Sequence, residues 1–149
     1  MKTFGRVLTA MVTSFNNDGS VNIENCVAIA NHLLDNTDPK LIKMAMLNLG
    51  YEAGFRGFNI ARKNAEKYGC SIPWVLLLDP TSACNLHCTG CWAAEYGNRL
   101  NLSFEDMDSI CTQAEELGIH AFLLTGGEPL VRKADVIRLC EKHKESAFH

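Results

Sequence analysis

The chain has 149 residues, of which 47% are hydrophobic and 21% are charged, a size and composition that suit one soluble domain with a real core. Its formal net charge of -3 shows no basic excess, so the broad electrostatic attraction of a nucleic-acid binder is not expected. No apolar run approaches the roughly 20 residues that span a bilayer, which predicts a cytoplasmic protein without a membrane partner.

The first part of the chain predicts a βα unit. Residues 6–15, RVLTAMVTSF, are rich in β-branched and apolar types and predict a strand, and the turn sequence NNDG follows at 16–19. Apolar residues then recur at helical spacing over 23–34, with Asn22 available as the N-cap.

A second helix is expected to begin at Asp38, because this residue can cap it and Pro39 can occupy its first turn. The helical pattern continues to Leu49. Three glycines are expected to interrupt the chain after it, namely Gly50, Gly54 and Gly57. A polar helix over 58–68 should then end at Gly69.

The second half predicts two strands that alternate with two helices. Residues 74–78 predict a buried strand, and Ser103 with Asp106 gives a capping signature for a helix that Gly118 ends. The segment 119–125, IHAFLLT, predicts a second strand. A final helix has its apolar positions at Val136, Ile137, Leu139 and Cys140. This order indicates an α/β protein built from βα units with a parallel sheet.

Three thiols lie in one loop directly after the first of these strands, in the sequence CNLHCTGC, at Cys84, Cys88 and Cys91. In a reducing compartment such clustering favours metal or redox chemistry over a disulfide framework. Three thiolates can hold three corners of a cubane iron–sulfur cluster and leave one iron open. Three other cysteines sit at apolar helical positions and are expected to be buried, namely Cys26, Cys111 and Cys140, while Cys70 is ambiguous.

The sequence GGEP forms the loop after the next strand. Ligands of parallel sheets collect at the carboxyl ends of the strands, so this loop and the cysteine loop should face a common crevice. CNLHCTGC matches the CxxxCxxC pattern of radical S-adenosylmethionine (radical SAM) enzymes, and GGEP, about 35 residues further on, is similar to the second motif of that family. The resemblance covers about residues 38–149.

The resemblance implies a 4Fe-4S cluster on the three cysteines, with S-adenosylmethionine chelating the fourth iron. It also implies that three residues face the methionine amine, namely Gly126, Gly127 and Glu128. Reductive cleavage would yield a 5'-deoxyadenosyl radical, with the electron from a donor such as ferredoxin or flavodoxin and an unassigned small-molecule or peptide substrate. One departure is Gly90, where many members have an aromatic residue; here the aromatic is Trp92.

Other interpretations of these residues stay open. His87 could complete a Cys3His zinc site, although its neighbour Cys88 would strain a tetrahedral centre. Glu128 could cap the helix that follows it. Trp92 and Tyr96 are expected to be packing residues. Solvated side chains are expected at the remaining histidines and at the basic pair after GGEP, namely His32, His120, His143, His149, Arg132 and Lys133.

Residues 4–36, FGRVLTAMVTSFNNDGSVNIENCVAIANHLLDN, resemble the opening βα unit of the dihydrodipicolinate synthase family, which are class I lyases on a (β/α)8 barrel. The resemblance ends before a Schiff-base lysine or its tyrosine partner can be assigned, and Ser14 replaces the usual proline. A lyase needs those groups.

The chain therefore reads as a fusion with three parts: a lyase-like βα unit over 1–36, a helical linker over 37–72 and the first part of a radical SAM core over 73–149. The two resemblances imply a βα-repeat fragment of TIM-barrel-like or partial-barrel type. The radical SAM core has more strands than the two predicted here, so we expect weak cofactor binding and negligible turnover from this segment alone. Two alternatives are a lyase-like fragment and a folded chimera without activity.

Overall fold

The computed structural model describes residues 15–91 and 96–149, and the chain forms two compact units, Met1–Met44 and Ala45–His149. The first unit contains helix α1 (Ile23–Asn36) and most of helix α2 (Pro39–Ala45). No helix in the described ranges is long and apolar enough to cross a bilayer.

Both predicted helix starts in the first unit are confirmed. The side chain of Asn22 accepts a hydrogen bond from the amide of Asn25 at 2.9 Å, and Asp38 accepts one from the amide of Lys40 at 2.8 Å. The predicted strand 6–15 lies outside the described residues except for Phe15, which forms an isolated antiparallel bridge across the turn.

The predicted interruption at the three glycines is wrong. A π-helix, η1 (Met46–Gly57), passes through all of them and leads into α3 (Phe58–Tyr68), which ends at Gly69 with a φ of 66° as predicted. The helix tolerates Gly57 because that glycine has a packing role: a Cβ there would lie 2.5 Å from the carbonyl oxygen of Gly118. Close packing of this kind outweighs the intrinsic helix cost of glycine, about 1 kcal/mol.

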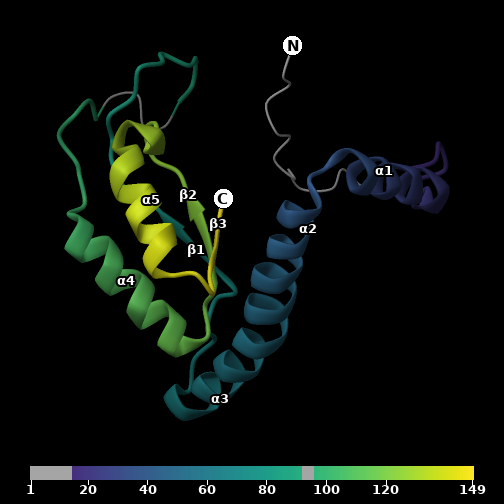
Figure 1. The fold of residues 1–149 in the computed structure, drawn as a ribbon, viewed down its shortest axis with the longest axis horizontal. Helices are drawn as coiled ribbons and strands as arrows, with labels where there is room; N and C mark the ends of the chain where they lie inside the picture. The colour runs from purple at the N-terminus through teal and green to yellow at the C-terminus, as the bar shows by residue number, and fades with distance from the viewer. Residues whose placement is uncertain (1–14, 92–95) are drawn as a thin grey trace. The chain divides into compact units, whose positions relative to one another are not determined.

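A parallel three-stranded sheet forms the centre of the second unit (Figure 1). Its order is β1 (Val75–Leu78), β2 (Ala121–Leu124) and β3 (Ala147–Phe148), and both pairs are parallel. The sheet confirms the α/β class and is compatible with a partial βα fragment. The third strand was not predicted, because two residues are too short to show a period.

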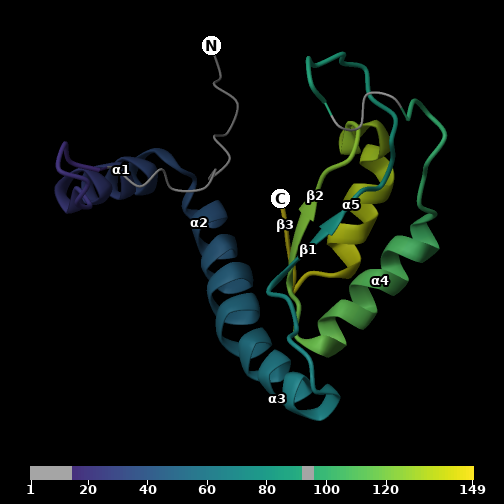
Figure 2. The ribbon, with the colours of Figure 1, turned by 180° about the vertical axis from the view of Figure 1, so that it is seen from behind.

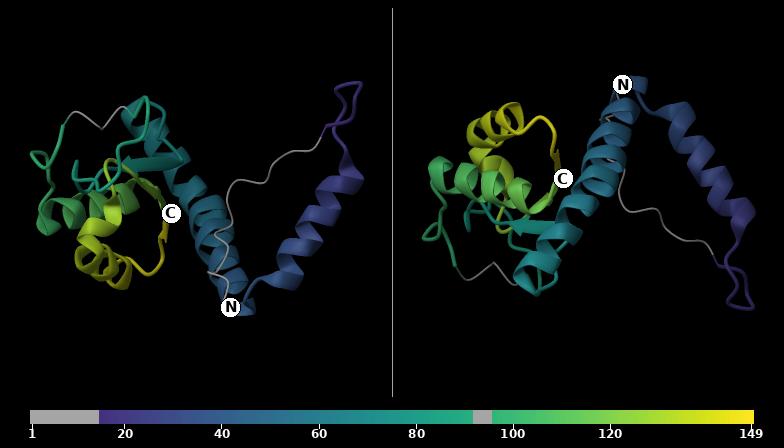
Figure 3. Two further views of the ribbon diagram at one scale, coloured as in Figure 1. Left: turned by 90° about the horizontal axis from the view of Figure 1, so that it is seen from above. Right: turned by 90° about the horizontal axis from the view of Figure 1, so that it is seen from below.

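Helices α4 (Phe104–Leu117) and α5 (Lys133–Lys142) lie side by side on one face of the sheet (Figures 1 and 3). The core between these helices and the strands contains Leu78, Phe104, Met107, Cys111, Ala114, Ile119, Phe122 and Leu139. Helix α4 begins at the predicted capping box of Ser103 and Asp106, and Gly118 ends it with a φ of 98°. The opposite face of β1 is seen in Figure 2, and Leu77 on that face is 62% exposed.

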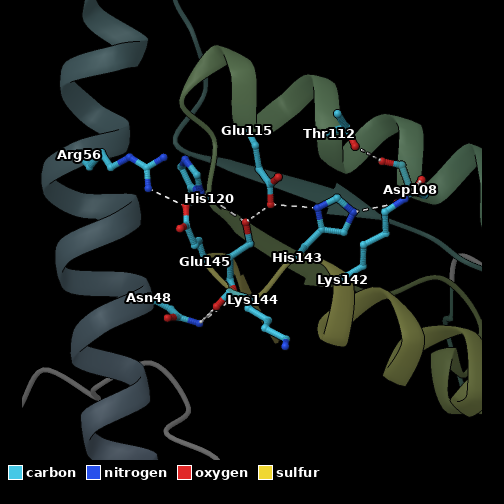
Figure 4. Close-up of polar contacts among 11 residues, drawn as sticks. Asn48, Arg56, Asp108, Thr112, Glu115, His120, Lys142, His143, Lys144 and Glu145 are labelled. Atoms are coloured by element: carbon cyan, nitrogen blue, oxygen red, sulfur yellow. Dashed lines mark hydrogen bonds and ion pairs between the residues drawn. The ribbon is translucent and has the colours of Figure 1, made fainter.

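A polar network lies at the amino ends of β2 and β3 (Figure 4). The two ring nitrogens of His143 lie 3.0 Å from a carboxylate oxygen of Glu115 and 3.1 Å from one of Asp108. The hydroxyl of Ser146 donates to Glu115 at 2.6 Å. His143 and His120 are both buried, so the prediction that they are solvated is wrong. The partners that bury them come from distant segments, which their own sequence positions do not reveal.

We expect His143→Ala to lower the free energy of unfolding of the full chain by about 2 kcal/mol, because it removes the buried ring that lies within hydrogen-bond distance of two partly buried carboxylates and leaves a space in its place. Urea denaturation at pH 7 measures the change. The control is His87→Ala, which removes an exposed imidazole. Equal unfolding midpoints for the two variants would contradict the role given to the network.

Acid should weaken the same network through Asp108. A hydrogen bond from Lys142, and a smaller contribution from His143, hold the pKa of the Asp108 carboxyl below its usual value. A lowered folded pKa stabilises the fold above the unfolded pKa, and this stabilisation is lost as pH falls below about 4. The stability difference between wild type and Asp108→Asn should therefore be largest near neutral pH and shrink toward pH 3. Urea midpoints at several pH values test this, with Glu141→Gln as the control for the loss of an exposed carboxylate, and a constant difference for Asp108→Asn would refute the role given to Asp108.

Candidate functional site

The candidate site lies at the carboxyl end of the sheet, opposite the buried network. The cysteine loop follows β1 and the loop Gly126–Glu128 follows β2, its neighbour in the sheet. Adjacent parallel strands therefore deliver both predicted motifs to one edge, where ligands of such sheets bind.

The cysteine loop leaves and returns through two paired arms, residues 80–82 and 100–102, which we call the stem. The amide of Leu102 donates to the carbonyl of Pro80 at 3.1 Å, and the amide of Ser82 donates to the carbonyl of Leu100 at 2.8 Å. Between these bonds, the buried hydroxyl of Thr81 donates to the side-chain oxygen of Asn101 at 2.6 Å. The stem closes the loop at its base, a feature that periodicity did not predict.

The second loop is bound to the first through its backbone. The amide of Gly127 donates to the carbonyl of Thr81 at 2.9 Å, and the amide of Glu128 donates to the carbonyl of Ala83 at 2.7 Å. Gly126 has a φ of 102°, and a Cβ at Gly127 would lie 2.2 Å from the oxygen of Ala83. Glycine is therefore required where the two loops touch. The predicted meeting of the two loops at one edge is what the structure shows.

The three predicted ligands, Cys84, Cys88 and Cys91, are exposed on the cysteine loop. Cys84 directly follows Ala83, the residue that accepts the amide of Glu128. The amide of Leu86 donates to Sγ of Cys84 at 3.4 Å, the kind of bond that stabilises a thiolate ligand. Among the described residues, no three His, Cys, Asp or Glu side chains gather closely enough to hold a metal ion. The loop nevertheless carries three exposed thiols, one of which accepts a hydrogen bond from a backbone amide, and thiolates are the ligands that iron–sulfur clusters use.

The other cysteines differ from these three in burial. Cys111 is fully buried, and its burial raises the pKa of the thiol to about 12, so it stays protonated. Cys140 and Cys26 are half-buried, and burial also raises the pKa of Cys140. Cys70 is exposed. All seven cysteines, each within the described ranges, are free.

Two residues beside the second loop have roles in the fold itself. The carboxylate of Glu128 accepts the amide of Leu130 at 2.9 Å and so caps the short 3-10 helix η2 (Pro129–Arg132), as the alternative interpretation predicted. Arg132 was expected to be solvated, and that prediction is wrong: its side chain is 20% exposed and binds the stem and Asp135. Trp92 lies outside the described residues, while Tyr96 and Lys133 are exposed.

A cavity of about 790 Å³ lies beside the stem and the end of β1, within the size range of small-molecule sites. Its lining is mainly apolar and includes Leu76, Leu78, Thr81, Tyr96, Leu100 and Gly126. The cavity thus adjoins both loops of the candidate site.

Comparison with known proteins agrees with the two motifs. The family model of the radical SAM superfamily matches residues 78–148. The GTP 3',8-cyclase of Geobacter sulfurreducens is 45% identical over 75 residues, which are 48% of this chain and 23% of that protein. The GTP 3',8-cyclase of Mesorhizobium japonicum is 34% identical over 86 residues, or 54% of this chain and 26% of that protein. The chain therefore matches about a quarter of the length of these curated relatives. No solved structure matches it.

We expect Gly127→Ala to destabilise the second unit by about 2 kcal/mol, because the added methyl group would overlap backbone atoms of Ser82 and Ala83 that cannot rotate away. Urea denaturation measures the change. The control is Gly50→Ala, where a Cβ meets nothing within 4 Å and the helix should become slightly more stable. A Gly127→Ala protein as stable as wild type would mean that the two loops do not touch.

Proposed function

We propose that this protein binds a 4Fe-4S cluster through Cys84, Cys88 and Cys91, on the premise that residues 78–148 belong to the radical SAM superfamily. The observation that carries the proposal is the backbone docking of Gly127 onto Thr81 of the stem and of Glu128 onto the adjoining Ala83, directly before the first of the three cysteines. Two motifs separated along the sequence thereby lie side by side, which supports a single shared site.

Each residue of this site would have a distinct task. The three thiols, as thiolates, would each ligate one iron, which leaves the fourth iron for the amine and carboxylate of S-adenosylmethionine. The amide of Leu86 would stabilise the charge on the Cys84 sulfur. Gly126 and Gly127 lack side chains that would keep the methionine amine from their carbonyl groups.

The bound cluster would pass one electron, taken from ferredoxin or flavodoxin, to the sulfonium of S-adenosylmethionine, so that the bond between sulfur and the 5' carbon would break into methionine and the 5'-deoxyadenosyl radical. A reducing cytoplasm fits a site made of free thiols. The matched relatives are named for a cyclisation of GTP, but the match covers only about a quarter of each. We therefore extend the proposal to the cofactors and not to a substrate.

Anaerobic reconstitution of the full chain with iron and sulfide should give a brown protein with about four irons per chain. Cys84→Ala, Cys88→Ala and Cys91→Ala should each lose the colour and most of the iron, because each removes one of three ligands. Cys70→Ala is the matched control, since it removes an exposed thiol outside the loop and should retain both. Visible absorption and iron analysis are the measurements.

Two further readings separate this proposal from the zinc alternative. Addition of S-adenosylmethionine should change the electron paramagnetic resonance signal of the reduced cluster, because the cofactor binds the open iron. A colourless protein that takes up one zinc per chain, and loses it in His87→Ala, would replace the cluster by a Cys3His zinc site.

A further inference from the structure

Arg132 lies at the base of the cysteine loop and contacts both arms of the stem. Its Nη1 donates to the carbonyl oxygen of Pro80 at 3.2 Å and also to that of Leu102. Pro80 opens the outgoing arm and Leu102 closes the returning one. One guanidinium nitrogen therefore connects the two arms of the stem at the base of the cysteine loop.

The position of this guanidinium is fixed from its other side by Asp135. Nε and Nη2 of Arg132 donate to the same carboxylate oxygen of Asp135, at 3.0 and 2.6 Å. Asp135 lies in the first turn of α5, where the helix dipole favours a negative charge. The pair is largely shielded from water, with side chains 20% and 31% exposed, so its hydrogen bonds are stronger than those of a surface ion pair.

Arg132 also belongs to the segment that carries the second motif. It is the last residue of η2, which begins directly after Glu128, and the amide of Glu128 is itself bonded to Ala83. The stem is thus bound twice by this segment, through the backbone of Gly127 and through the side chain of Arg132, and Glu128 holds the adjoining Ala83.

We infer that Arg132, oriented by Asp135, is a positioning residue for the three thiols: it holds the base of the cysteine loop closed and in a fixed place beside Gly126 and Gly127. This inference rests on the proposed function. Lysine cannot replace arginine here, because a single ammonium group lacks the planar set of donors that reaches both carbonyls and the carboxylate together.

The test uses the full chain and the variants Arg132→Lys and Asp135→Asn. In the protein without iron, hydrogen exchange at the amides of Ser82, Leu102 and Gly127 should become about tenfold faster in Arg132→Lys, as expected when charge-assisted hydrogen bonds are lost. Exchange in α4 should not change. Asp135→Asn keeps the guanidinium but loosens its orientation, so a smaller change is expected there.

After reconstitution, Arg132→Lys should lose iron to a chelator at about tenfold lower concentration than wild type, the size of effect seen for residues that support metal ligands. Its urea midpoint should stay close to that of wild type, which separates positioning from general destabilisation. The matched control is Arg138→Lys, the same exchange on α5 at an arginine that packs over the ring of Phe104 at 3.7 Å instead of on the stem.

Unchanged exchange at the stem in Arg132→Lys would overturn the inference, and so would faster exchange with wild-type retention of iron. If wild type itself takes up no iron, the proposed function fails, and the inference about the thiols fails with it. The exchange data would then still decide separately whether Arg132 closes the stem.

Discussion

Close backbone contact between the loops that follow β1 and β2 is the constraint on which the candidate site depends. Gly127 lies so near Ala83 that no side chain fits between them, and its amide reaches the carbonyl of Thr81. The stem, the cap at Glu128 and the contacts of Arg132 are all arranged around this approach. The two glycines of the GGEP sequence are commonly explained by the ligand they contact. In this structure they are also needed because one loop packs directly on the other.

The two ends of the sheet are built from different chemistry. At the amino ends of the strands, buried His143 lies between Asp108 and Glu115, so we expect a change to this network to lower the free energy of unfolding. At the carboxyl ends, buried residues stop at Ala83, and the chain from Cys84 to Cys91 is exposed. Reactive groups at one end can thus be altered without disturbing the packing that maintains the other, as is common where a rigid scaffold carries functional loops.

Local signals in the sequence predicted local structure well. The Ser103–Asp106 capping box and the stop at Gly118 were predictable because both depend only on neighbours in the chain. The path of η1 through Gly57 was not, since it depends on Gly118, far along the sequence. The burial of His143 and the contacts of Arg132 were missed for the same reason. The two motifs of the site were found because the order of strands and loops places them at one edge.

Burial separates the three cysteines that we propose as cluster ligands from Cys111. Cys111 lies in the core, and a thiol with a pKa of about 12 stays protonated at neutral pH and does not bind iron readily. The thiols of the cysteine loop are exposed and lie on a segment whose base is held by the stem, so iron can reach them without opening the core. Cys70 shares their exposure but stands alone after Gly69, outside the stem. Exposure alone therefore does not single out the three proposed ligands; what they share beyond it is a single loop whose base the stem closes.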